Sequence, residues 1–216
     1  MKKTHIVVIS ALLLLMLFVL GSFLVKGKQQ DSLSALARKN AEALVRDHSQ
    51  TAGSPDAKVV IVEFMDPGCE TCRAFDPFIK QMMAAYPGKI RLVIRYAPLH
   101  HGADFMCAVL EAARKQGKYW ETLQLMYDTQ PQWADHHNPQ PDRIWQYLPR
   151  LGLDLKKLKK DLDDPAISRL IAQDMADARA LDVRKTPGFF VNGKPLVRFG
   201  YEQLQALIEG ELRANY

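Results

Sequence analysis

The feature that most constrains the fold is a short apolar segment that runs directly into two closely spaced cysteines. Residues 58–65 (KVVIVEFM) are rich in β-branched side chains, and Cys69 and Cys72 follow them at the start of a helical segment, residues 69–86. An apolar run of this length predicts a strand buried on both faces. Residues 89–99 predict a second strand, so the order strand–helix–strand indicates a parallel β-α-β unit.

The rest of the chain predicts one α/β domain over residues 55–216. Residues 103–182 have an almost wholly helical pattern. Residues 188–199 place Asn192-Gly193 between two β-prone runs, which is a strong hairpin signal, and a final helix follows. The order β-α-β, helical block, β-β-α therefore indicates an α/β fold with a helical insertion.

The N-terminus carries 20 consecutive residues without a charge, residues 6–25. A helix of that length spans about 30 Å, the thickness of the hydrocarbon core of a bilayer. Lys2 and Lys3 precede the run, and no small-x-small cleavage site ends it, so an uncleaved signal-anchor is favoured over a cleavable signal. We therefore expect a single transmembrane helix over residues 6–25, with residues 1–5 on the cytoplasmic side.

Residues 26–54 are predicted to form a linker and an amphipathic helix between the anchor and the domain. The polar linker is residues 26–30, and the helix covers residues 31–48. Residues 49–57 are rich in Gly, Pro and Ser, which predicts a loop.

The charge distribution gives no reason to expect a nucleic-acid partner. The chain has a formal charge of +5, but four lysines and no acidic residue lie in residues 1–30. Residues 31–216 hold 25 basic and 24 acidic residues, so the domain itself is close to neutral. No basic face is left for a nucleic-acid backbone.

The two cysteines have four possible roles, of which redox chemistry fits best. A zinc site commonly needs four ligands, and the only other cysteine is Cys107, so no metal is expected. Haem attachment requires histidine after the second cysteine, where this chain has Arg73. A structural disulfide across two residues would constrain the unfolded chain little. A C-x-x-C pair beside a β-α-β pattern favours a redox-active pair.

The redox interpretation assigns different roles to the two thiols. At the start of a helix, unpaired N–H groups stabilise a thiolate at Cys69, which lowers its pKa from about 8.5 toward neutrality. Cys72 lies one turn later and can attack a mixed disulfide to resolve it. Glu70 and Thr71 lie between them and should tune the pair. Because the Glu70 charge opposes the thiolate, we expect a milder oxidant than a relative with histidine in this dipeptide.

Three stretches of the chain together resemble the thioredoxin-fold thiol oxidoreductases, most closely the DsbA-like group with its membrane-anchored, BdbD-like members. The similarity covers about residues 55–212. The first stretch is VEFMDPGCETC, the second is Pro77, five residues after the second cysteine, and the third is KTPGFFVNGKPLV. The resemblance implies a thioredoxin-like fold with a DsbA-type helical insertion at about residues 103–182.

The resemblance also assigns roles to residues outside the C-x-x-C pair. Glu63 matches a buried acid beneath the active site, which would relay a proton to or from Cys72; its alternative is a strand-end acid that reaches solvent. Thr186-Pro187 matches the cis-proline loop, whose backbone would pair with an extended substrate; its alternative is an ordinary trans proline.

The resemblance implies a protein that introduces disulfides into cysteine-containing exported proteins through Cys69–Cys72, with no cofactor other than this redox-active disulfide. Its domain would lie on the periplasmic side of the inner membrane, and a DsbB-like, quinone-linked oxidase in the membrane would reoxidise it. Two alternatives stay open: a membrane-tethered reductase or isomerase served by a membrane reductase, and a copper-handling thiol module. Cys107 is expected to be a buried, inert thiol, with an intermolecular disulfide as the alternative.

Overall fold

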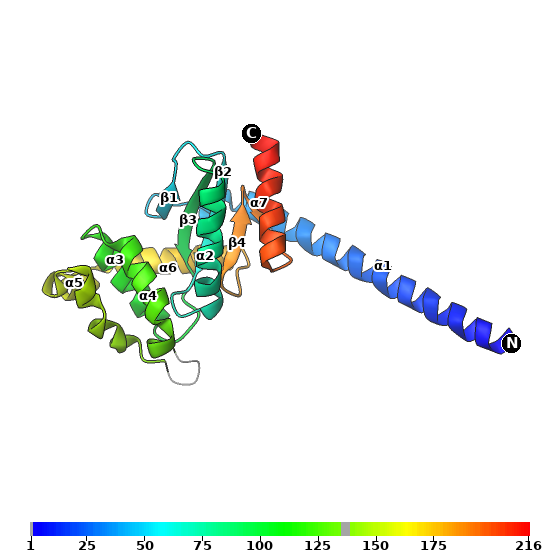
Figure 1. Ribbon diagram of the computed structural model, residues 1–216, viewed down its shortest axis with the longest axis horizontal. Coiled ribbons are helices and arrows are strands. Elements are labelled where there is room, and N and C mark those ends of the chain that lie inside the picture. The colour runs from blue at the N-terminus through cyan, green and yellow to red at the C-terminus, as the bar shows by residue number, and fades with distance from the viewer. Residues whose placement is uncertain (1, 135–138) are drawn as a thin grey trace.

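A five-stranded sheet forms the centre of the domain in the computed structural model, which describes residues 2–134 and 139–216 (Figure 1). Met1 and residues 135–138, the latter inside the predicted insertion, lie outside the described residues. The strand order is β1-β3-β2-β4-β5; β2 and β3 are parallel, as predicted, and the other neighbouring pairs are antiparallel. The strands are β1 (Gln50–Gly53), β2 (Val59–Met65), β3 (Ile90–Tyr96), β4 (Gly188–Val191) and β5 (Lys194–Pro195).

The helices follow the predicted order along the domain. They are α1 (Lys2–Lys39), α2 (Glu70–Ala85), α3 (Ala103–Arg114), α4 (Tyr119–Trp133), α5 (Leu155–Leu162), α6 (Pro165–Ala180) and α7 (Tyr201–Asn215), with short 3-10 helices η1 (Ala41–Ala43), η2 (Pro141–Gln146) and η3 (Leu148–Leu151). The described part of the predicted helical insertion is therefore α3 to α6. The hairpin is confirmed too: Asn192 and Gly193 both have positive φ, at 46° and 78°.

Alternate residues of β2 serve the two faces of the sheet. Ile61 and Met65 belong to the larger core cluster, which also includes residues of α2 and α7. Val62 and Phe64 belong to a smaller cluster with residues of α6 and the end of α1. These residues on both faces of β2 are almost fully buried, which explains why residues 58–65 form an almost continuously apolar segment of the sequence. Glu63 shares the face of Ile61 and Met65, because side chains alternate along a strand.

The segment before the domain differs from the prediction. α1 runs without interruption to Lys39, so residues 26–30 are helical instead of a linker, and the helix ends before residue 48. Ala37 is only 1% exposed and packs in the smaller core cluster, so tertiary contacts hold the end of α1. Residues 50–53 form β1 instead of a loop, because they pair with β3. Across the part of the chain that the structure describes, no helix is both long and apolar enough to cross a membrane.

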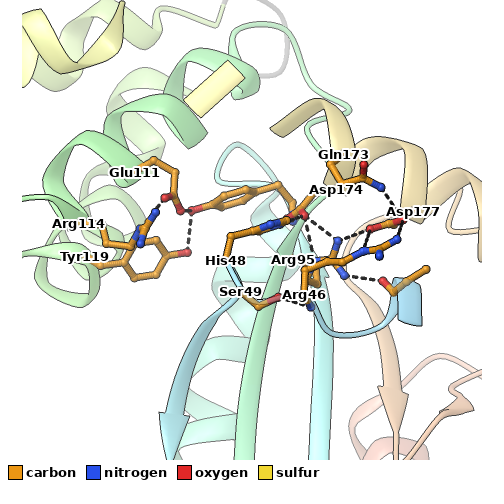
Figure 2. A network of polar contacts seen from close by, with 12 residues as sticks. Arg46, His48, Ser49, Arg95, Glu111, Arg114, Tyr119, Gln173, Asp174 and Asp177 are labelled. Atoms are coloured by element: carbon orange, nitrogen blue, oxygen red, sulfur yellow. Dashed lines mark hydrogen bonds and ion pairs between the residues drawn. The ribbon is translucent and has the colours of Figure 1, made fainter. Parts of the chain in front are cut away.

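A buried ionic network fastens the segment after α1 to α6 (Figure 2). Arg95 of β3 is fully buried, and its guanidinium donates to Asp174 at 2.7 Å and to Asp177 at 2.6 Å. Arg46 donates to the same Asp177 at 2.8 Å, and His48 lies 2.6 Å from Asp174. Two carboxylates thus face two guanidinium groups, which compensates the cost of burying these charges. The network was not predicted from the sequence.

Candidate active site

Cys69 lies at the N-terminus of α2, at the end of a tight turn that leaves β2. It is the N-cap residue, with φ −80° and ψ 117°, and its carbonyl accepts the N–H of Arg73 at 3.2 Å. Its own N–H donates to the carbonyl of Asp66 at 3.0 Å, which closes the turn. The predicted position at the start of the helix is confirmed, so the thiol stands beside the unpaired N–H groups of the first turn.

The surroundings of Cys69 favour a thiolate. Its pKa is lowered from an ordinary 9.0 to about 5, chiefly by a hydrogen bond with the Cys72 thiol. Burial opposes this shift, while the side chain of Thr186 and the backbone N–H groups of Cys72 and Thr71 add to it. At neutral pH Cys69 is therefore ionised, which makes it a nucleophile and a good leaving group. None of these main contributions comes from Glu70, which is exposed in the first turn of α2.

Cys72 has the opposite character. It is fully buried one turn along α2, and burial raises its pKa well above the ordinary value. The hydrogen bond to Cys69 and the neighbouring Glu63 charge raise the pKa further. Both cysteines are free thiols in this structure. The pair thus combines an ionised sulfur on Cys69, which is 6% exposed, with a protonated sulfur on Cys72, which is fully shielded, and thiol exchange in two steps uses one thiol of each kind.

Glu63 is buried beneath the pair, as the resemblance predicted. It is 4% exposed in the middle of β2, between Ile94 of β3 and Phe189 of β4 in the sheet register. Burial, followed by the charges of Asp76 and Cys69, raises its pKa from 4.5 to about 8. Its Oε1 atom has no hydrogen-bond partner among the described residues. A carboxyl group that is protonated at neutral pH therefore lies close enough to Cys72 to affect the pKa of that thiol.

The Thr186–Pro187 segment lies opposite Cys69. The peptide bond between the two residues is cis, as the resemblance predicted. The Sγ atom of Cys69 lies 3.2 Å from the Thr186 carbonyl oxygen, across 117 residues of sequence, and can donate to it only when the thiol is protonated. The turn that carries Cys69 follows the end of β2, and Thr186-Pro187 directly precedes β4. Because Phe64 of β2 pairs with Gly188 of β4, these two segments lie side by side. Thr186 and Pro187 also line a hollow that reaches Thr71.

Sequence reasoning missed the residue that shapes the turn before Cys69. Asp66 is fully buried, and its carboxylate accepts the N–H of Gly68 at 2.7 Å. It also accepts the N–H groups of Leu99 at 2.7 Å and His100 at 2.9 Å, and the His100 ring lies 2.8 Å away. One carboxylate thus ties the active-site turn to the loop after β3. The local signal was present, since an Asp before Pro-Gly favours a turn, but its distant partners were not readable.

A second missed residue, Gln130 of α4, holds the same turn from the insertion. It is 1% exposed, and its Nε2 donates to the carbonyls of Pro67 at 2.7 Å and Cys69 at 3.1 Å. The insertion therefore touches the active-site turn directly. Cys107 of α3 is fully buried, and burial raises its pKa well above the ordinary value, so the expected buried thiol is confirmed. Across the described residues, no group of three or more Cys, His, Asp or Glu side chains could hold a metal ion.

Comparison with known proteins points to one family. The family model described as thioredoxin matches residues 46–210. A thioredoxin-like oxidoreductase from Silicibacter pomeroyi DSS-3 is 28% identical, with a TM-score of 0.69 over 80% of this chain and 97% of that one. The thiol-disulfide exchange protein alpha-DsbA2 of Wolbachia pipientis, 19% identical, has a TM-score of 0.71 over 85% of this chain and 97% of its own. BdbD of Bacillus subtilis, 21% identical, has a TM-score of 0.63 over 76% and 93%. The last two likenesses show the fold, including its helical insertion.

Curated relatives carry a different name. A sequence from Herminiimonas arsenicoxydans named Na(+)/H(+) antiporter NhaA is 31% identical over 76% of this chain. One from Salinispora tropica named Na(+)/H(+) antiporter NhaA 3 is 34% identical over 69%. The matches cover 25% and 22% of those proteins, so the chain spans about a quarter of the length of these relatives. About three quarters of each of these relatives therefore has no counterpart in this chain, and the antiporter name refers to the whole relative.

Proposed function

We propose that this chain, which belongs to the thioredoxin family, is a DsbA-like thiol–disulfide oxidoreductase that introduces disulfides into exported proteins through Cys69 and Cys72. The observation that carries the proposal is the contrast between the two thiols. The pKa of Cys69 is lowered to about 5, while that of Cys72 is raised well above its ordinary value. A stable thiolate in the reduced state favours reduction of the enzyme, and hence oxidation of its substrate.

The reaction starts from the oxidised pair. A substrate thiolate attacks Sγ of Cys69, the bond between Cys69 and Cys72 breaks, and Cys72 leaves with the electron pair. The Cys72 thiolate takes up a proton, because its buried site disfavours the charge. We assign the delivery of this proton to Glu63, which holds one at neutral pH. Glu63 then regains a proton from solvent before the next cycle.

A second substrate thiolate completes the exchange. It attacks the substrate sulfur of the mixed disulfide, and Cys69 leaves as a thiolate, for which its low pKa suits it. The substrate has lost two electrons and two protons and gained a disulfide. The enzyme has gained the two electrons, with one proton on Cys72 and the other released to solvent. Reoxidation requires an acceptor, for which we propose a quinone-linked oxidase in the membrane; no organic cofactor on this chain is needed.

The backbone around Thr186 would hold the substrate during these steps. Its carbonyl lies 3.2 Å from Sγ of Cys69, so a strand that pairs with this segment places a substrate sulfur beside the nucleophile. Glu70 and Thr71 are exposed at the same edge and would tune the pair by charge and contact.

We also propose that residues 6–25 anchor the domain to the inner membrane, with the catalytic domain on the periplasmic side. Support comes from the uncharged run itself and from its exposed apolar side chains, such as Leu12 at 59% and Phe18 at 74%. Figure 1 shows this part of α1 extending away from the domain. An exposed apolar surface of this extent is typical of a segment that contacts a membrane or another protein. Release of the protein from membranes by alkaline carbonate would contradict the anchor.

Trapping of mixed disulfides tests the exchange. A Cys72→Ser variant cannot resolve the bond to Cys69, so it should accumulate substrate adducts on non-reducing gels, whereas Cys69→Ser and Cys107→Ser should not. Alkylation of intact cells should find Cys69 and Cys72 mostly oxidised at steady state. Mostly reduced cysteines with abundant adducts would support the reductase or isomerase alternative. Tight copper binding without any adduct would support the metal-handling alternative.

A further inference from the structure

Two hollows meet beneath α1, beside the redox site. The first, of about 610 Å³, is lined by Thr71 and Thr186 and also by Leu33 of α1. The second, of about 530 Å³, is lined by Gln30 of α1 and by residues of α7. The two hollows share three lining residues, so these form a common floor. They are Pro195, Leu196 and Val197.

The position of α1 over this floor is fixed by contacts with the domain. The Nε2 atom of Gln30 donates to the carbonyl of Pro195 at 3.4 Å. Two turns later Ala37 is 1% exposed within the smaller core cluster. Leu33 lies between these contacts and is half-buried. A helix that precedes the catalytic domain therefore provides part of the lining of a groove that also includes Thr71 and Thr186 of the candidate active site.

The lining of the groove defines the chemistry of its occupant. Leu33, Leu196 and Val197 give it an apolar wall and floor. At the end near Thr186, Arg184 donates to Asp182 at 2.5 Å, and Lys185 is exposed beside the substrate-facing backbone. This composition fits an extended peptide with apolar side chains and a carboxylate close to its cysteine, because the carboxylate would face the surplus positive charge.

We propose that α1 is a specificity element of the redox site, and that Leu33 contacts the apolar side chains of an extended, cysteine-containing segment of the substrate. The inference rests on the proposed thiol–disulfide exchange and deepens it by naming the substrate class. The cysteine of the segment forms its bond to Cys69 while the bond between Cys69 and Cys72 breaks, as in the mechanism above. The helix before the domain thus takes part in selecting the substrate.

Filling the groove from α1 tests the proposal. The full chain, oxidised and in detergent, is mixed with single-cysteine peptides that carry leucines and one aspartate before or after the cysteine, and separately with glutathione. Leu33→Trp should lower the second-order rate constant for the better peptide about tenfold and change that for glutathione less than twofold. Ala35→Trp is the matched control, because Ala35 is exposed on the same helix and is not part of either lining. It should leave both rates unchanged.

A second measurement does not depend on the folding of the tryptophan variant. In a Cys72→Ser background the peptide is supplied as a disulfide with thionitrobenzoate. Cys69 attacks the peptide sulfur and thionitrobenzoate leaves, so the peptide is held on Cys69 as a mixed disulfide. A photo-crosslinking amino acid replaces Leu33 or Ala35. Crosslinks to the peptide from position 33, with few from position 35, would support the proposal. Equal crosslinking from the two positions, or a normal peptide rate in Leu33→Trp, would overturn it. If the wild-type chain reacts with neither peptide nor glutathione, the proposed exchange itself fails.

Discussion

The burial of Glu63 leads to a prediction about the pH dependence of stability. The change is Glu63→Gln, which keeps the size of the side chain and removes its titration. The pKa of this carboxyl group is about 8 in the folded chain, against 4.5 ordinarily. Between these values the folded state binds a proton that the unfolded state has lost. The free energy of unfolding therefore falls as pH rises from about 4.5 to about 8.

The size of the effect follows from the shift. Each pKa unit corresponds to about 1.4 kcal/mol, so between pH 5 and pH 8 this carboxyl group removes about 3 to 4 kcal/mol of stability. The side chain is 4% exposed, so solvent screening reduces this little. Cys69 acts with the opposite sign, because its lowered pKa adds stability as pH rises from about 5 toward 9.0. That contribution is common to both proteins and cancels to first order in their difference.

The assay is urea-induced unfolding of the wild type and Glu63→Gln at pH 5 and pH 8, followed by tryptophan fluorescence. The variant should gain about 3 to 4 kcal/mol relative to the wild type between the two pH values, whatever the absolute cost of the buried amide. Glu70→Gln serves as the control, because it makes the same substitution at an exposed position. If the free energy of unfolding changed by the same amount between pH 5 and pH 8 in Glu63→Gln and in the wild type, the raised pKa of Glu63 would be refuted. The assignment of proton delivery to Glu63 would then fail as well.

Three further changes test the remaining parts of the account. Asp66→Asn should cost about 2 to 3 kcal/mol, because a buried acceptor of several hydrogen bonds is impaired, and an unchanged urea midpoint would contradict this. Arg95→Met should cost about 3 to 5 kcal/mol by leaving buried carboxylates uncompensated; a loss no larger than that of the exposed Arg184→Met would oppose it. Glu70→Gln should lower the pKa of Cys69 by less than about half a unit, as measured by thiolate absorbance, and a larger shift would give Glu70 a stronger role.

Local sequence patterns were sufficient for most of the domain. The apolar run of β2, the cysteines at the start of α2 and the Asn192-Gly193 turn each depend on neighbouring residues, and each was predicted at nearly its observed position. The burial of Glu63 and the cis bond before Pro187 were predicted through the family resemblance. Their chemical roles remain predictions.

The parts that could not be predicted depend on distant contacts. α1 continues through residues 26–30, although their polar character and Gly27 favoured a linker, and its end is held by packing on the domain. β1 forms because residues 50–53 pair with a strand some 40 residues later. Gln130 reaches the turn before Cys69 across 61 residues of sequence. The neighbouring residues in the sequence do not indicate which distant residues the end of α1, β1 and Gln130 contact.

The reduction potential of Cys69–Cys72 in equilibrium with glutathione tests the central claim most directly. A thioredoxin with a nucleophile of pKa about 7 has a potential of about −270 mV, and lowering this pKa to about 5 stabilises the reduced state by about 50 mV at pH 7. We therefore predict a potential of about −220 mV or higher, but below the value of about −120 mV for the strongest oxidant of this type, whose nucleophile has a still lower pKa of about 3.5. A potential at or below about −270 mV would contradict the proposal that this site donates disulfides.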